Sequence, residues 1–376
     1  MSFSENPKPI YIKYIAALFV ATLLVILVFG LNPKDFRFSN NVIRLTDQPG
    51  IRFDKYGIAF TRSFIGSSMD GFSIEIALKP LGNADDGFNH IFTLHNGKDS
   101  DQLIIGQWLS WIIIMNGDDY AHKRGTKRIA INIASPTPIP RFISITTGQA
   151  GSRAYMNGHL IRGEKDLFLR IPRGDDTRLI LGNSVSGKHS WKGDVYGLAF
   201  YRSALKDEDV LRHFSAWSKN RDFVFAEESE PMALYIFNGK NATMVFDRAS
   251  GNFPLEVPMR MQILKKDILS WKWSSLSFNK ILIKDMVINL IGFIPFGFFL
   301  FAWIGQLGGG FKNHPALLVV GIGFMVSMGI EITQAWMPSR SSQIVDLTLN
   351  TIGTCVGVFI YQLFFGHNRK ISVCKY

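Results

Sequence analysis

The stretch "EITQAWMPSRSSQIVDLTLNTIGT", residues 331–354, places ionisable and amide side chains between two strongly apolar runs. Its main polar members are Glu331, Gln334, Arg340, Ser341, Asp346 and Asn350. A charged side chain at the centre of a bilayer costs on the order of 3 kcal/mol, so such groups usually pair with one another or have a function. The runs that flank the stretch indicate which environment these side chains occupy.

Four strongly apolar segments are each long enough to cross a membrane, and the first of them carries no charged residue. A helix needs about 20 residues to cross a hydrocarbon layer that is about 30 Å thick. The segments are residues 14–31, 286–303, 315–337 and 347–365. The first could also be a cleaved signal peptide. However, its apolar core is long and "FGLNPKDF" (29–36) lacks the small-x-small cleavage pattern, so a retained helix is favoured.

Basic residues in the short flanks predict the orientation of these spans. They lie before the first span, between the second and third, and after the fourth: Lys8, Lys13, Lys312, Arg369, Lys370 and Lys375. Four crossings put all three flanks on one side of the membrane, and positively charged flanks stay in the cytoplasm. We therefore expect both termini to be cytoplasmic, and the long insertion and the loop that carries Arg340 to be outside.

The insertion, residues 45–258, has the pattern of an antiparallel β domain. "GFSIEIALKP" (71–80) alternates, which puts Phe72, Ile74, Ile76 and Leu78 on one face. In "YMNGHL" (155–160), the Asn157-Gly158 dipeptide is a strong hairpin signal. Further short strands are expected in "RFISITTG", "TRLILGNS" and "DVYGLAFYRSAL", and a helix in "SALKDEDVLRHFSAW". The predicted fold class is an α+β membrane protein: an antiparallel β-sandwich of the jelly-roll, concanavalin A-like type plus four transmembrane helices.

Several of these strands carry a family resemblance. "FSIEIALKP", "RAYMNGHL", "LILGNS" and "WKGDVYGLAFYRSALKDEDVLRHF" resemble the successive strands of a laminin G-like, concanavalin A-like domain, over residues 50–250 or so. Domains of this kind bind sugars, proteins or calcium, so the resemblance implies a fold more strongly than a ligand. Glu75 stands without the nearby second and third acids that a concanavalin A-like glucanase needs. The acidic turns "NADDGFNH" (83–90) and Asp175-Asp176 could bind calcium, although acidic turn residues are more often solvated.

The last three spans each carry one stripe of polar and small residues at helical spacing. The stripes are Asp285, Asn289 and Gly292; Gly323, Ser327, Glu331 and Gln334; and Asp346, Asn350, Gly353 and Gly357. The alternating direction of the spans brings the ionisable groups together in the outer leaflet. We therefore predict a ligand-binding polar cluster of Asp285, Asn289, Glu331, Gln334, Arg340, Asp346 and Asn350. Close helix packing is expected at Gly292, Pro295, Gly353 and Gly357.

The same spans carry a second resemblance. "DMVINLIGFIPFGFFL" and "EITQAWMPSRSSQIVDLTLNTIGTCVG" resemble the two signature blocks of the VanZ-like family of bacterial membrane proteins, over residues 285–358. The matching positions include the polar cluster together with Gly292, Pro295, Gly297, Pro338, Gly353 and Gly357. The resemblance implies a location in the bacterial inner membrane. It also implies a relation to proteins that confer resistance to teicoplanin-type lipoglycopeptide antibiotics. The large insertion after the first span is a departure from the family pattern.

The predicted organisation has five parts. They are a flank and first span (1–31), the exterior sandwich (45–258), a linker (259–284), the VanZ-like three-helix region (285–366) and a cytoplasmic tail (367–376). Trp271 and Trp273 in the linker suit the headgroup layer of the outer leaflet. The net charge of +11 does not indicate nucleic acid, because the chain lacks a basic helix and an aromatic RNA-binding motif. Two cysteines, Cys355 and Cys374, offer no metal-ligand spacing, so no metal site is predicted.

Three functions remain open on these residues. In the favoured one, the sandwich binds a saccharide or glycopeptide of the cell envelope, and the polar cluster contacts membrane lipid and a lipid-linked or lipidated partner. In the second, the protein is a membrane-embedded enzyme with Glu331 and Asp346 as acid and base, and the hydroxyl of Ser341 or Ser342 as a further group. In the third, the cluster only holds the helices together, and Arg340 pairs with Glu331 or Asp346.

Overall fold

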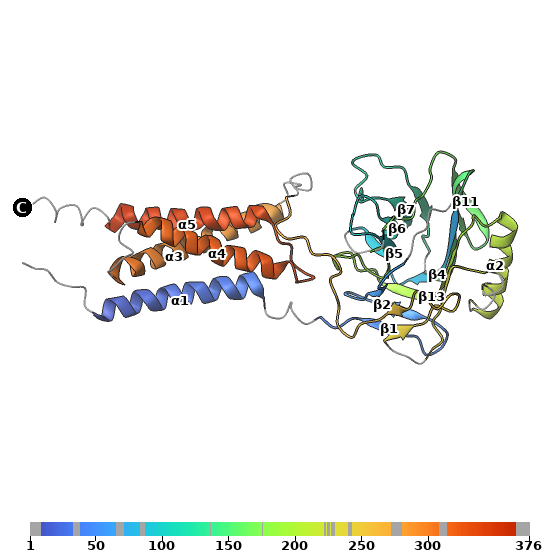
Figure 1. Ribbon diagram of the computed structural model, residues 1–376, viewed down its shortest axis with the longest axis horizontal. Helices are drawn as coiled ribbons and strands as arrows, with labels where there is room; N and C mark the ends of the chain where they lie inside the picture. The colour runs from blue at the N-terminus through green and yellow to red at the C-terminus, as the bar shows by residue number, and fades with distance from the viewer. Residues whose placement is uncertain are drawn as a thin grey trace, which may run out of the picture. The chain divides into compact units, whose positions relative to one another are not determined.

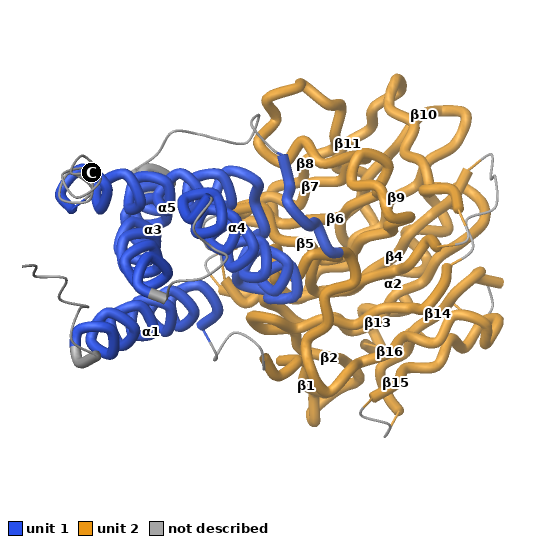
Figure 2. The backbone as a smooth tube through the Cα atoms, turned by 60° about the vertical axis from the view of Figure 1, so that its left-hand side comes forward, with its two compact units in different colours: residues 1–36, 266–376 blue, residues 37–265 orange. Residues whose placement is uncertain are grey.

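The apolar segments and the β-patterned insertion form separate units of the chain. The structure, a computed structural model, describes residues 9–32, 38–64, 71–82, 87–135, 137–174, 176–221, 223, 226, 230–239, 243–271, 280–307 and 314–365. One unit spans residues 37–265, and the other combines residues 1–36 with residues 266–376 (Figure 2).

The second of these units is a helix bundle. It consists of α1 (Pro9–Leu31), α3 (Lys280–Leu307), α4 (Pro315–Gln334) and α5 (Ile344–Phe365), which lie side by side (Figure 1). All four are long and apolar enough to cross a membrane, which confirms the four predicted spans of a multi-pass membrane protein. The third span ends at Gln334, three residues before the predicted end, because the chain turns ahead of Pro338.

Helices α3 and α5 approach each other at backbone distance. An added Cβ would collide with a backbone carbonyl of the partner helix at three glycines: Gly297 with Thr354, Gly353 with Leu290, and Gly357 with Ile294. Leu290 of α3 lies against Gly353 of α5, and Ile294 of α3 lies against Gly357 of α5. Because the residue numbers of both helices increase from the first contact to the second, the two helices run parallel. Such close approach is the role that small residues have between membrane helices.

The glycine that α3 contributes to this contact differs from the one expected. A Cβ added at Gly292 would have no atom within 4 Å among the described residues, whereas Gly297 lies against the backbone of α5. Pro295 is exposed and sits inside the helix. The difference of five residues reflects the rotation of α3, which turns Gly297 and not Gly292 toward α5.

The insertion folds as two antiparallel sheets packed as a sandwich, which confirms the predicted fold (Figure 1). The first sheet has the order β1 (Val42–Arg44), β2 (Ile51–Phe53), β13 (Gly193–Tyr201), β4 (Phe72–Pro80), β9 (Arg141–Gly148), β10 (Gly151–Met156), β11 (His159–Glu164), with β14 (Ala233–Ile236) also on β13. The second has the order β15 (Met244–Val245), β16 (Leu255–Glu256), β3 (Ala59–Thr61), β12 (Arg178–Leu181), β5 (Asn89–His95), β6 (Leu103–Trp108), β7 (Trp111–Asn116), β8 (Ile129–Asn132).

Strand β4 is buried on both faces. Phe72, Ile74, Ile76 and Leu78 face the core between the two sheets, as their alternation predicted. The opposite face of the first sheet is covered by α2 (Asp207–Asn220), whose Trp217 belongs to a second apolar cluster. Glu75 lies on this second, covered face.

The hairpin between β10 and β11 has the predicted turn. Met156 pairs with His159, and Asn157 and Gly158 between them both have positive φ, 53° and 79°. Asparagine and glycine tolerate this left-handed backbone better than other residues, which explains their preference in such turns.

Candidate functional site

The seven residues of the polar cluster lie toward one end of the helix bundle. Glu331 and Gln334 are in the last turn of α4, and Asp346 is in the first turn of α5. Helices α4 and α5 run antiparallel, because Ser327 contacts Asn350 while Glu331 contacts Gln343. Since α3 is parallel to α5, Asp285 and Asn289 near the start of α3 lie at the same end, and Arg340 lies in the α4–α5 connection.

Glu331 connects α4 to the beginning of α5. Its side chain is only 1% exposed, and its Oε2 accepts the backbone N–H of Gln343 at 2.8 Å. Gln343 directly precedes α5, and the first backbone N–H groups of a helix have no partner within the helix. A carboxylate at that place satisfies one of them and interacts favourably with the helix dipole. Glu331 therefore acts as an N-terminal cap supplied by a neighbouring helix.

Asp346 is joined to α3. Asn289 Nδ2 donates a hydrogen bond to Asp346 Oδ1 at 2.7 Å. Asp346 and Asn289 are both half-buried, and Asp285, one turn before Asn289, is exposed. The parallel helices α3 and α5 thus present two carboxylates and an amide near their common amino ends, where the helix dipole favours negative charge.

Asn350 lies deeper, between α4 and α5. Its Nδ2 donates to Ser327 Oγ at 2.9 Å, and both side chains are buried. Thr354 Oγ1 donates to the Asn350 carbonyl at 3.0 Å. The side-chain Oδ1 of Asn350 has no hydrogen-bond partner among the residues that the structure describes. This part of the stripe is a buried contact between helices.

Gln334 and Arg340 reach the end of α1. Gln334 Nε2 donates to the carbonyl of Gly30 at 2.8 Å, and Arg340 Nη2 donates to the carbonyl of Phe29 at 3.3 Å. The last carbonyls of a helix lack partners within the helix, so these donors complete the end of α1. Two members of the cluster thereby tie α1 to the α4–α5 connection.

The linker contributes a contact that the sequence did not indicate. Leu269 N donates to Ser342 Oγ at 2.9 Å, and the Ser270 N–H and hydroxyl both donate to the Ser342 carbonyl, at 3.0 and 2.9 Å. Ser342 is buried and precedes Gln343, the residue that Glu331 binds. The chain before α3 therefore braces the loop that positions Glu331. Trp271 is exposed, and Trp273 lies outside the described residues.

Metal-ligating residues do not gather in the described part of the chain. There, no group of three or more His, Cys, Asp or Glu side chains is arranged to hold a metal ion. Of the acidic turn residues for which calcium was considered, Asp85, Asp86 and Asp175 lie outside the described residues, and Asp176 is exposed. The chemistry available at the bundle end is that of carboxylates, amides and a guanidinium.

Comparison with protein families identifies the C-terminal region. Residues 233–365 match the family model described as VanZ/LLP1. The match includes α3, α4 and α5, and it confirms the VanZ-like resemblance of residues 285–358. It also extends back through β14, β15 and β16 of the sandwich. No curated protein matches the chain.

Solved structures are similar to part of the chain at low identity. The receptor binding domain of botulinum neurotoxin D is 14% identical over 48% of this chain and 47% of that one, with a TM-score of 0.37. The K499G mutant of NanB sialidase from Streptococcus pneumoniae is 17% identical over 43% of this chain and 27% of that one, with a TM-score of 0.34. The chain thus spans less than half the length of either structure.

Proposed function

From the match of residues 233–365 to the VanZ/LLP1 family, we propose that this chain is a bacterial inner-membrane binding protein. Both termini lie in the cytoplasm and the sandwich lies outside. The sandwich binds a saccharide or glycopeptide of the cell envelope, and the polar cluster binds a lipid-linked or lipidated partner. A link to resistance against teicoplanin-type antibiotics follows from the family resemblance.

The observation that carries the proposal is the accessible polar surface at the amino ends of α3 and α5. Asp285 is exposed, and the Asn289–Asp346 pair is half-buried. Further along α3, the apolar side chains of Ile288 and Ile291 are also exposed. A ligand with a hydroxyl-rich or cationic head and an apolar tail meets carboxylates first and then an apolar helix surface. That is the chemistry of a lipidated saccharide or glycopeptide.

The burial of Glu331 favours binding over catalysis. A general acid or base must come within hydrogen-bond reach of the substrate atom with which it exchanges a proton. Glu331 is 1% exposed and its Oε2 already holds the N–H of Gln343. Of the two carboxyls considered for acid–base chemistry, therefore, one supports the helix end and Asp346 is the more accessible.

The membrane half of the proposal is tested with the full-length protein in lipid nanodiscs. The probe is teicoplanin, compared with its deacylated form, by calorimetry. We expect tighter binding of the lipidated form, and a loss of 10-fold or more in Asp346→Asn. The matched control is Thr348→Val, which removes an exposed hydroxyl on α5 that, among the described residues, donates to the Ile344 carbonyl of its own helix. Equal binding by Asp346→Asn and the control would contradict the proposal.

Acid–base chemistry is separated from recognition by two changes at one position. Glu331→Gln keeps an acceptor for Gln343 but removes the titrating group, whereas Glu331→Leu removes both. Resistance or binding that survives Glu331→Gln argues against acid–base chemistry at Glu331, and its loss in Glu331→Leu then reports the loss of the helix cap. Loss in both variants, with an intact fold, supports the enzyme alternative.

The exterior half is tested by screening envelope saccharides and muropeptides against the full-length protein. If saccharide binding is retained in Asp346→Asn, the saccharide site lies in the sandwich and not at the polar cluster. Failure of every saccharide to bind would leave the sandwich as a spacer and would overturn this half of the proposal.

A further inference from the structure

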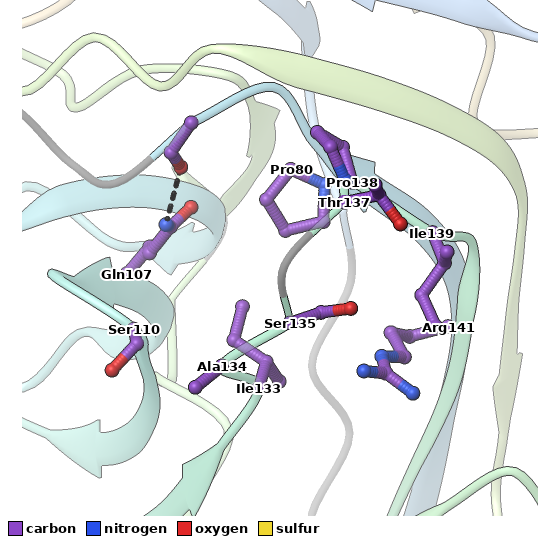
Figure 3. A pocket seen from close by; sticks show the side chains of 11 residues that line it. Pro80, Gln107, Ser110, Ile133, Ala134, Ser135, Thr137, Pro138, Ile139 and Arg141 are labelled. Atoms are coloured by element: carbon purple, nitrogen blue, oxygen red, sulfur yellow. Dashed lines mark hydrogen bonds between the residues drawn. The ribbon is translucent and has the colours of Figure 1, made fainter.

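A pocket opens at one end of the sandwich, where strands of both sheets terminate (Figure 3). We call it the rim pocket. Its walls come from Pro80 at the end of β4, Arg141 at the start of β9, Gln107 and Ser110 of the β6–β7 hairpin, and residues 133–135 and 137–139 after β8. Its volume is ≈ 240 Å³. Pockets for drug-sized ligands are about 300–1,000 Å³, so the rim pocket suits a single small ring.

The wall formed by the β6–β7 hairpin is fixed. Gln107 is 2% exposed, and its Nε2 donates to the carbonyls of Gly82 and Leu109 at 3.0 and 2.8 Å. Its Oε1 accepts the Trp191 indole N–H at 2.7 Å. With these bonds, Gln107 has a structural role and holds the hairpin against β4. Because the wall is already in place, a ligand loses little free energy in ordering it.

The described residues between β8 and β9, 133–135 and 137–140, form a second wall. The Ile133 N–H donates to the Ser110 carbonyl at 2.8 Å, which ties the start of this segment to the hairpin tip. Pro138 and Pro140 then restrict the backbone φ angles ahead of Arg141. The pocket is therefore bounded on one side by the β6–β7 hairpin, and on the other by backbone that is tied to the hairpin at Ile133 and restricted in φ at Pro138 and Pro140.

The polar groups of the pocket that are not engaged in the fold define its chemistry. Arg141 is half-buried and is the one charged side chain among the described residues of the lining. Among the described residues, its guanidinium and the hydroxyls of Ser110, Ser135 and Thr137 make no hydrogen bond or ion pair with the protein. In Figure 3 the guanidinium and the Ser135 hydroxyl lie on one side of the opening and Gln107 on the other.

A guanidinium whose N–H groups are available to a ligand binds a specific kind of chemical group. Its planar N–H groups match a carboxylate, to which they can donate two parallel hydrogen bonds. Hydroxyl groups that both donate and accept match the hydroxyls of a sugar, and the apolar faces of Pro80 and Ile139 match its C–H face. We propose that the rim pocket binds one sugar ring that carries a carboxylate, with Arg141 on the carboxylate. This inference rests on the proposed saccharide role of the sandwich and assigns it a place and a ligand class.

The experiment compares glucuronate with glucose as probes of the full-length protein in nanodiscs, by ligand-observed NMR. The account predicts binding of glucuronate, weakening of that binding as salt is raised, and binding of glucose at least 10-fold weaker. Arg141→Gln should weaken glucuronate at least 10-fold. Arg170→Gln, which changes an exposed arginine outside the lining, should leave the affinity unchanged.

A second variant tests the pocket independently, in case Arg141→Gln does not fold. Ala134→Phe fills the pocket from an exposed position and keeps the arginine, so it should also abolish glucuronate binding. Equal affinity for glucose and glucuronate, or unchanged binding in both folded variants, would overturn the inference. If glucuronate fails to bind while an envelope glycan binds in the saccharide screen, the rim pocket assignment falls and the proposed function stands.

Discussion

Two nearly fully buried carboxylates, Glu75 in the sandwich and Glu331 in the bundle, are stabilised in different ways. Glu75 is 0% exposed and accepts hydrogen bonds from three side chains: Ser144 at 3.2 Å, Tyr201 at 3.0 Å and His213 at 2.9 Å. Glu331 is 1% exposed and accepts a backbone N–H at the start of α5. The first is held by a side-chain network, and the second completes a helix.

The network around Glu75 is a structural device. Its donors come from β9, β13 and α2, so the single carboxylate on β4 fixes the helix and two neighbouring strands. Burial raises the pKa of Tyr201 well above its usual value, and the nearby Glu75 charge raises it further, so the tyrosine stays a donor. In the bundle, by contrast, the carboxylate of Asp285 is exposed and that of Asp346 is half-buried, although Asp346 also accepts a hydrogen bond from Asn289. The proposed binding surface thus differs from the network around Glu75 in the accessibility of its carboxylates.

Of the variants that test this difference, removal of Glu75 should have the largest effect on the free energy of unfolding. Glu75→Ala leaves His213, Tyr201 and Ser144 without their common acceptor, and removing one partner of a buried hydrogen bond costs about 1–3 kcal/mol for each group affected. Urea unfolding of the sandwich, followed by the fluorescence of the buried Trp191 and Trp217, measures this loss. Removal of the half-exposed Glu164 is the control and should change stability by about 0.5 kcal/mol or less. Equal losses of stability in the two variants would contradict the structural role of Glu75.

The next effect concerns helix packing in the bundle. Gly353→Leu forces a side chain into the Leu290 carbonyl and should destabilise the α3–α5 contact by about 1–3 kcal/mol, as overpacking does. Gly292→Leu meets open space among the described residues and should be neutral or slightly stabilising, since glycine is a poor helix former. Thermal unfolding in detergent separates the two. A larger loss at Gly292 than at Gly353 would contradict the observed helix rotation.

A smaller loss of stability is expected when Glu331, the buried carboxylate of the bundle, is removed. Loss of an N-terminal cap costs about 0.5–2 kcal/mol, which is the loss expected in Glu331→Leu. Glu331→Gln retains an acceptor for Gln343 and should retain most of the stability. Hydrogen exchange of the amides of residues 343–347 measures the local opening of α5. If these amides stay protected in Glu331→Leu, Glu331 does not cap the helix.

The smallest expected effect is a pH dependence of local stability in the sandwich. It arises at Asp119, a carboxylate that accepts backbone N–H groups, as Glu331 does. Burial raises the pKa of Asp119, but the backbone N–H groups of Thr126 and Arg124 outweigh it and lower the pKa to about 2. Because the folded pKa lies below the unfolded value, the stabilisation is present above about pH 4 and is lost as the pH falls toward 2.

Amide protection in residues 119–126 reports this transition. It should decline between pH 4 and pH 2 in the natural protein, and Asp119→Asn should remove the decline. A decline of the same size in Asp119→Asn would assign the pH dependence to another group.

The sequence predicts the elements whose signals are local. Hydropathy alone identifies four spans, because each must present about 20 apolar residues in a row. Alternation identifies β4, and the Asn157-Gly158 pair identifies the β10–β11 turn, because both signals come from neighbouring residues. These features need no knowledge of the tertiary structure.

Strands β5 to β8 carry no such signal, and the sequence analysis did not single them out. Ile105 and Ile112 face the core between the sheets, whereas Ile104 and Ile113 face a separate apolar cluster with Phe88. Strands buried on both faces read as continuous apolar runs, and continuous runs do not distinguish a strand from a buried helix.

Contacts between distant residues account for the rest of what sequence reasoning could not show. Glu75 is a lone acid in the sequence, because its partner His213 lies 138 positions away. Likewise, Ser270 and Ser342 are 72 positions apart, and nothing local connects the linker to the loop beside Glu331. The position of the polar cluster was predictable because its helical residues repeat at helical spacing and the spans alternate in direction; its role stays a prediction.

The proposed exterior binding site depends most on which side of the membrane the polar cluster faces. The direct measurement uses single cysteines in a chain in which Cys355 and Cys374 are replaced by serine. Position 339 of Ser339→Cys is exposed in the α4–α5 connection, and position 314 of His314→Cys is exposed at the opposite end of α4. A maleimide that cannot cross membranes should label position 339 in intact cells and position 314 only after lysis. The reverse pattern would place the carboxylates in the cytoplasm and contradict an exterior binding site.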